Sequence, residues 1–145
     1  MAWKERFFGY REIIPDFSGF LDAVQRPLPV HLRVNRLKAR PERVVAELAD
    51  EGVHLVPSHP RDDTLYRAPN LESPGNLPAY FLGHIHPQAL TSCLAAQALG
   101  PGPEACVLDL CAAPGGKTAH MAQEMENQGI LVANDLHTGR HPALS

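Results

Sequence analysis

The sequence predicts an α/β protein in two parts: a small α+β module, followed by the first βαβ unit of a Rossmann-like domain whose sheet is incomplete within 145 residues. Apolar and polar residues alternate strictly over residues 30–35, which is typical of a half-buried strand. Two nearly apolar runs, at residues 107–110 and 130–133, are instead typical of parallel strands buried on both faces. A proline-rich segment separates the two patterns.

The first module begins with a helix and a strand. Apolar residues recur at helical spacing over residues 17–24, and Pro27 ends this helix. The strand at 30–35 has two distinct faces, because successive side chains point in opposite directions. Its core face is expected to carry Val30, Leu32 and Val34, and its other face His31, Arg33 and Asn35.

A second helix and a second strand complete what the sequence shows of this module. Pro41 suits a first helical turn, and Gly52 suits the end of the helix. Residues 53–56 predict a short strand. The segment 57–87 contains six prolines and is expected to be an irregular connection. We therefore expect residues 1–82 to form the first module with its linker, and residues 83–145 to begin a second domain.

The second domain shows a clearer order of elements. A helix is predicted from Pro87 to the Gly-Pro-Gly-Pro sequence at 100–103. The strand at 107–110, a turn of small residues, a helix over 117–128 capped by Gly129 and the strand at 130–133 make one βαβ unit.

Composition excludes several classes of protein. A net charge of -3, with 44% hydrophobic and 20% charged residues, is ordinary for a globular chain and argues against disorder or a coiled coil. The apolar runs are too short to span a membrane, and no secretory signal is present at the start, so no membrane partner is expected. Three cysteines without metal-ligand spacing predict no metal and a reducing, cytoplasmic location.

Basic residues are concentrated at one end of the chain. Residues 1–43 hold nine Lys and Arg against five Asp and Glu, whereas the remainder holds four against eleven. A basic face on an acidic chain is compatible with contact to nucleic-acid phosphates. Charge alone favours the simpler alternative of a solvated surface.

The most informative stretch follows the strand at 107–110. Residues 111–116 are small, so a ligand can approach their backbone closely. Free N–H groups at the start of the following helix attract an anion, and Lys117 adds a positive charge. Open α/β sheets bind their ligands at this end of the strands. The sequence therefore predicts a site for a carboxylate or a phosphate.

Two kinds of ligand compete for this loop. Residues 116–118 fit the end of a P-loop, but Cys111 replaces its first glycine and Pro114 lacks an amide N–H. A nucleoside site instead needs an acid after the next strand, to bind ribose hydroxyls. Asp135 stands there. The residues favour a nucleoside, with a P-loop nucleotide-binding protein as the alternative.

These residues also resemble a known family. The string at 109–118, together with residues 133–135 and Arg140, is similar to the cofactor motif of the Sun (RsmB/NOP) family of RNA cytosine-5 methyltransferases. Residues 29–38 resemble that family's Arg-Val-Asn-x-Leu-Lys segment. Gly83, Gln88 and Ser92 resemble its segment before the first motif strand. The similarity runs from about Phe17 to Arg140 and suggests the amino-terminal part of such an enzyme.

The resemblance implies a class I methyltransferase domain with S-adenosylmethionine as cofactor and rRNA or tRNA as partner. Lys117 would lie near the methionine carboxylate, and Asp135 would accept hydrogen bonds from the ribose. The implied cofactor-binding residues are Cys111, Ala112, Ala113, Pro114, Gly115, Gly116, Lys117, Asp135 and Arg140. The implied RNA-binding residues are Arg33, Asn35, Arg36 and Lys38.

The implied reaction is methylation of carbon 5 of cytosine. The family activates the ring by adding a cysteine thiolate to the neighbouring carbon, and its nucleophilic cysteine lies downstream of the segments matched here. Cys93 and Cys106 are expected to be small buried hydrophobes. No catalytic residue is therefore expected in this chain, and the chain alone is expected to transfer no methyl group. A non-catalytic RNA-binding remnant is a further alternative.

Overall fold

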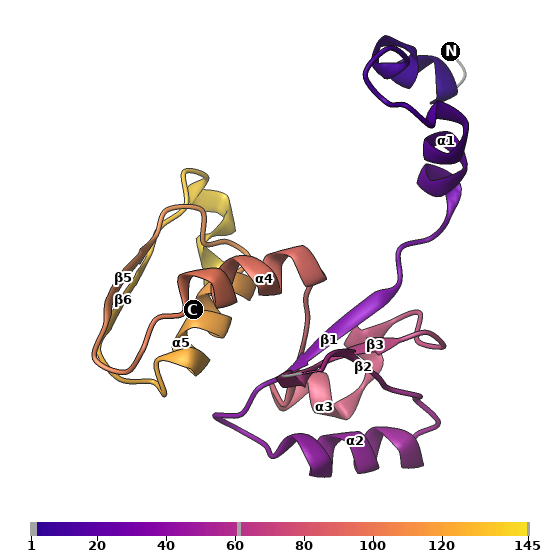
Figure 1. Ribbon diagram of the computed structural model, residues 1–145. Helices are drawn as coiled ribbons and strands as arrows, with labels where there is room; N and C mark the ends of the chain where they lie inside the picture. The colour runs from indigo at the N-terminus through magenta and orange to yellow at the C-terminus, as the bar shows by residue number, and fades with distance from the viewer. Residues whose placement is uncertain (1–2, 61, 145) are drawn as a thin grey trace.

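The computed structural model describes residues 3–60 and 62–144. Figure 1 shows three parts along the chain: a helical segment at the amino end, a sheet with helices, and a second α/β unit. We call residues 30–87 the first module and residues 90–144 the second module.

The amino-terminal segment consists of the 3-10 helix η1 (Trp3–Tyr10) and the helix α1 (Phe17–Gln25), which confirms the helix predicted there. Asp16 caps α1, because its Oδ1 accepts a hydrogen bond from the Gly19 amide at 2.8 Å. The Phe7 and Phe20 rings join the two helices edge to face, with centroids 5.4 Å apart. In Figure 1 this pair stands away from both modules.

The first module is an antiparallel sheet of β1 (Val30–Val34), β2 (Val56–His59), β3 (Asp62–Ala68) and β4 (Ile85–Pro87), in the order β2-β3-β1-β4. The helix α2 (Pro41–Asp50) covers one face. Leu32 and Val34 of β1 are buried in one core with Val44 and Leu48 of α2, which confirms the core face predicted from the alternation in β1.

The proline-rich segment is more ordered than predicted. The prediction of a strand at 53–56 is wrong, because β2 begins only at Val56. The supposedly irregular residues 57–87 contain most of β2, all of β3 and β4, the 3-10 helix η2 (Pro74–Asn76) and the short helix α3 (Pro78–Phe81). Pro57 is tolerated because β2 lies at the edge of the sheet. The sheet continues to residue 87, past the domain boundary expected at 82.

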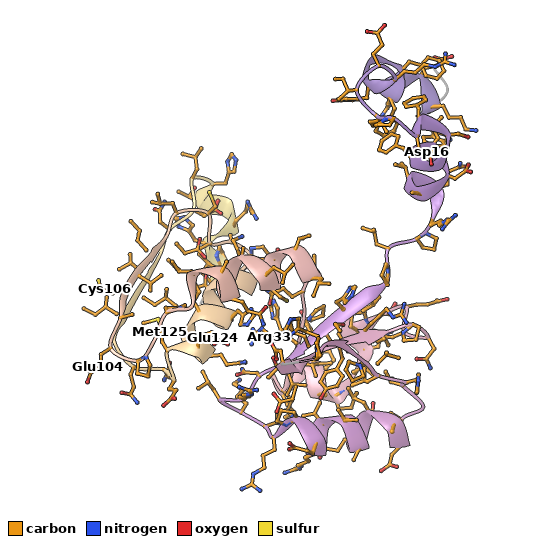
Figure 2. The ribbon with its side chains drawn as sticks, viewed as in Figure 1. Asp16, Arg33, Glu104, Cys106, Glu124 and Met125 are labelled. Carbon is orange, nitrogen blue, oxygen red and sulfur yellow. The ribbon has the colours of Figure 1, made fainter. Side chains whose placement is uncertain are left out.

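The second face of this sheet is also buried. Arg33 of β1 stands opposite Leu65 of β3, so both side chains point to the same side. Only 1% of Arg33 and 2% of Leu65 are exposed. Figure 2 shows Arg33 between the sheet and the second module. The polar residues of β1 therefore do not mark a solvent face.

The second module contains α4 (Leu90–Leu99), β5 (Cys106–Asp109), α5 (Gly116–Glu124), β6 (Ile130–Ala133) and the 3-10 helix η3 (Thr138–Leu144). β5 and β6 pair in parallel, which confirms the predicted βαβ unit. Both helices differ in extent from the prediction: α4 begins three residues after Pro87, which closes β4, and α5 ends at Glu124 instead of residue 128. β5 begins and ends one residue earlier than predicted. Glu126 and Asn127 have positive φ angles of 53° and 56°, which no α-helix accommodates.

The strands of the second module are covered on one face only. Val107 is 9% exposed and packs with Met121 and Met125, whereas Leu108 and Ile130 are 58% and 59% exposed. The prediction of strands buried on both faces is therefore wrong for the described residues. Cys106 is exposed, against prediction, while Cys93 is buried as expected. No helix in the described part of the chain is long and apolar enough to cross a membrane.

Candidate cofactor site

The candidate site lies where β5 and β6 end. Because the strands run in parallel, the loop after β5 and the residues after β6 meet at one edge of the sheet. Two backbone hydrogen bonds join them: the Asn134 amide donates to the Asp109 carbonyl at 2.8 Å, and the Ala112 amide donates to the Asn134 carbonyl at 2.9 Å. The loop after β5 and the residues after β6 are thus in direct contact, although they lie far apart in the sequence.

Asp109 holds the loop closed. Its Oδ1 accepts from the Cys111 amide at 3.1 Å, and its Oδ2 accepts from the Thr118 hydroxyl at 2.7 Å. In a P-loop the hydroxyl at the position of Thr118 binds magnesium. Here that hydroxyl is committed to a buried carboxylate, which argues against the P-loop alternative.

Asp135 faces the loop from the other strand. Its Oδ1 accepts from the His137 amide at 3.0 Å, and its Oδ2 accepts from the Ala113 amide at 3.2 Å. Arg140 lies 3.5 Å from the same Oδ2 and also donates to the Ala113 carbonyl. The His137 amide and the Arg140 charge lower the pKa of Asp135. An ionised carboxylate therefore lies beside the loop at neutral pH.

A cavity of about 170 Å³ lies beside this loop. Five of the predicted cofactor-binding residues line one side of it: Ala112, Ala113, Pro114, Gly116 and Lys117. The other side is lined by His86, Pro87, Gln88, Ala89 and Ser92. Cys111, Gly115, Asp135 and Arg140 are not part of this lining. Gly115 has a different role: it precedes α5 with a φ of +104°, a conformation that favours glycine.

Gly116 lies close to the opposite wall of the cavity. A Cβ at this position would lie 3.3 Å from His86 Nε2 and 3.6 Å from Gln88 Cδ. Burial, with the positive charge of Arg33, lowers the pKa of His86, so this imidazole is neutral at pH 7. The first module thus supplies part of the wall opposite the cofactor loop.

None of His86, Gln88 and Ser92 was predicted to be a site residue. They stand in and just after the proline-rich segment, where hydrophobic periodicity is weak. The only available signal was the family similarity at Gln88 and Ser92. Among residues 3–60 and 62–144, no three His, Cys, Asp or Glu side chains gather to hold a metal ion; the absence of a metal stays a prediction.

The four predicted RNA-binding residues fall into different environments. Arg33 is buried and donates to Gln88 and Gln123, so its expected availability to RNA is wrong. Asn35 holds a turn, with its Oδ1 accepting from the Leu37 amide at 3.1 Å. Arg36 and Lys38 remain exposed, and Arg36 pairs with the exposed carboxylate of Asp63.

Comparisons with known proteins show which family the chain resembles. Residues 96–145 match the family model described as 16S rRNA methyltransferase RsmB/F. A human 28S rRNA (cytosine(4447)-C(5))-methyltransferase is 40% identical over 122 residues, which are 83% of this chain and 15% of that protein. A tRNA (cytosine(49)-C(5))-methyltransferase from Pyrococcus abyssi is 35% identical over 128 residues, 88% of this chain and 41% of that protein.

A solved structure gives the same result. A methyltransferase homologue from Pyrococcus horikoshii superposes with a TM-score of 0.76 and 31% identity, over 88% of this chain and 42% of that one. The fold and site thus define part of a Rossmann-like methyltransferase domain joined to an α+β module. The chain belongs to the RsmB/NOP family of RNA cytosine-5 methyltransferases. It spans less than half the length of the relatives named here.

Proposed function

We propose that the protein carrying this chain transfers a methyl group from S-adenosylmethionine to carbon 5 of cytosine in rRNA or tRNA. The observation that supports this most directly is the placement of ionised Asp135 against the small-residue loop, at the ends of two parallel strands. Family membership supports the choice of reaction. The cytoplasmic location stays a prediction.

The residues present fit the cofactor. When bound, S-adenosylmethionine supplies an electrophilic methyl group on its sulfonium. The Lys117 ammonium and the first N–H groups of α5 attract the carboxylate of the methionine part. The small side chains of Ala112 and Ala113 leave room beside the backbone. Asp135 offers two carboxylate oxygens, each with more than one lone pair, to the ribose hydroxyls.

A binding measurement tests this assignment. Isothermal calorimetry on the full-length protein should show uptake of S-adenosylmethionine and none of ATP, with or without magnesium. Asp135→Ala should weaken cofactor binding by about tenfold or more, because hydrogen bonds to a charged group are lost. Asp50→Ala, at the far end of α2, is the matched control and should have no effect. Magnesium-dependent ATP uptake without cofactor binding would refute the proposal.

RNA contact is proposed for the exposed basic residues that follow β1. Arg36→Glu and Lys38→Glu should weaken RNA binding at low salt and flatten its dependence on salt concentration, since each removes a phosphate contact. Arg43→Glu, on the exposed side of α2, reverses the same charge outside this group and serves as control. Equal losses for all three variants would point to a diffuse charge effect and not to a defined contact.

A further inference from the structure

Arg33 is an unusual buried charge. Its Nε donates to Gln88 Oε1 at 3.1 Å and its Nη1 donates to Gln123 Oε1 at 2.5 Å. No ion pair of the described residues includes it, although Asp62 and Glu124 lie close enough to influence its pKa, which burial lowers. A buried arginine held only by neutral amides leaves most of its positive charge uncompensated.

The contact with Arg33 also fixes which way the Gln88 amide is turned. A guanidinium has no acceptor, so the carbonyl oxygen of Gln88 must face it. The donor Nε2 then occupies the other branch of the amide. This Nε2 is buried and has no hydrogen-bond partner among the described residues. Gln88 itself is only 7% exposed.

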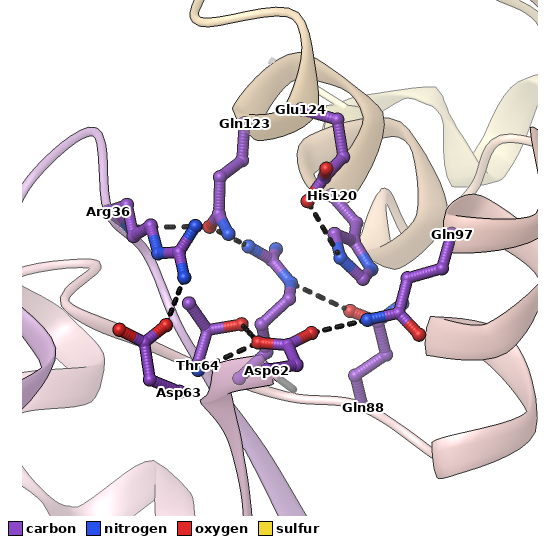
Figure 3. Close-up of polar contacts among 10 residues, drawn as sticks. Arg36, Asp62, Asp63, Thr64, Gln88, Gln97, His120, Gln123 and Glu124 are labelled. Atoms are coloured by element: carbon purple, nitrogen blue, oxygen red, sulfur yellow. Dashed lines mark hydrogen bonds and ion pairs between the residues drawn. The ribbon is translucent and has the colours of Figure 1, made fainter. Parts of the chain in front are cut away.

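Gln88 belongs to the wall of the 170 Å³ cavity, across from the cofactor loop. Its Cδ lies 3.6 Å from the position of a Cβ on Gly116, the first residue of α5. The cavity lining has one cation, Lys117, and no acidic side chain. Figure 3 shows Gln88 and Gln123 among the polar contacts that join the two modules. Gln88, whose amide donor has no partner, therefore lines the same cavity as the start of α5 and Lys117.

We propose that Gln88 is a binding residue for the carboxylate of the cofactor's methionine part, and that Arg33 is the positioning residue that turns its amide toward that carboxylate. The inference rests on the proposed function. It assigns to the short connection between β4 and α4 a direct share in cofactor recognition. Arg33 adds a fixed positive charge behind the amide, which favours an anion in the cavity.

Two ligands that differ only in the carboxylate provide the test: S-adenosylmethionine and its decarboxylated form. In the full-length protein, Gln88→Ala should weaken binding of S-adenosylmethionine about tenfold and leave binding of the decarboxylated form unchanged. Gln88→Glu keeps an acceptor for Arg33, and so keeps the fold, but removes the donor and repels the carboxylate. It should weaken S-adenosylmethionine binding still more.

A matched control comes from the same junction. Gln97 of α4 donates to Asp62 of β3 and joins the modules outside the cavity. Gln97→Ala should change the affinity for neither ligand. If Gln88→Ala weakens both ligands equally, or Gln88→Glu binds like the unsubstituted protein, Gln88 is only structural and the inference is wrong. If the unsubstituted protein binds neither ligand, the proposed function fails, and this inference with it.

Discussion

The two modules bury their apolar residues to different extents. In the first module one sheet is covered on both faces, by α2 on one side and by the second module on the other. In the second module the sheet of β5 and β6 is covered on one face, and Leu108, Ile130 and Val132 are half exposed or more. The chain spans less than half the length of the relatives named above, and its two-stranded piece of sheet leaves one apolar face without a covering layer.

The largest expected effect compares two leucines, one from each module. Leu48 is 0% exposed in the first core, so Leu48→Ala should lower the free energy of unfolding by about 3 kcal/mol through lost burial and a residual cavity. Leu108→Ala removes the same atoms from an exposed face and should change it by less than about 0.5 kcal/mol. Urea unfolding of both variants checks this; equal losses would show that the β5–β6 face is covered in solution.

Two glycines with nearly the same backbone conformation sharpen the comparison. Gly129 has φ +76°, and a Cβ there would lie 2.4 Å from the Ala105 carbonyl oxygen; Gly52 has φ +79° with nothing within 4 Å. Gly129→Ala should cost about 3 kcal/mol, from the left-handed backbone and the clash, whereas Gly52→Ala should cost about 1 kcal/mol. The difference in urea midpoints measures the clash alone. Equal midpoints would mean that the backbone at Ala105, just before β5, shifts without cost.

Prediction from sequence succeeded where a pattern has a single local cause. Alternation placed Leu32 and Val34 in the core, and parallel pairing of β5 with β6 followed from two short apolar runs around a helix. It failed at β3, where Thr64, Leu65 and Tyr66 are buried in succession because both faces are covered. Such a strand has no alternation to detect. The flanking Pro60 and Pro69, with the polar residues around the strand, indicated a loop instead.

The candidate site also has a part that the sequence predicts and a part that it does not. The cofactor loop and Asp135 could be predicted because they follow adjacent strands of one βαβ unit. The cavity wall formed by His86, Gln88 and Ser92 could not, since it depends on how the first module docks on the second. The same docking buries Arg33, whose charge in an alternating strand suggested exposure. Contacts between modules have no periodic signal in the sequence.

The pH dependence of the free energy of unfolding should differ between buried His120 of α5 and an exposed histidine of the first module. His120 is 0% exposed, and burial, with the positive charge of Arg33, lowers its pKa to about 4, while Asp62 acts in the opposite direction. The His120 imidazole is therefore neutral at pH 7, and at this pH its contact with Glu124 at 3.6 Å is not an ion pair. In the unfolded chain a histidine binds its proton near pH 6.5.

The sign of the effect follows from this difference. Between about pH 6.5 and 4, His120 binds a proton in the unfolded state but not in the folded state. The free energy of unfolding therefore falls as the pH falls, by at most about 1.4 kcal/mol per pH unit. His120→Leu should flatten this slope in urea unfolding between pH 7 and 5. His54→Leu, at an exposed histidine of the first module, should not. Asp135 has a lowered pKa and matters only below about pH 4.

The smallest expected effect concerns an arginine whose environment is opposite to that of Arg33. Arg43 pairs with Glu47 one turn along α2 at 2.6 Å, and its side chain is 72% exposed. Water screens such a pair, so Arg43→Ala should cost only about 0.3–0.5 kcal/mol, and less at high salt. A double-mutant cycle with Glu47→Ala isolates the pair. A coupling above about 1 kcal/mol would mean that water does not screen the charges on this open face of the first module.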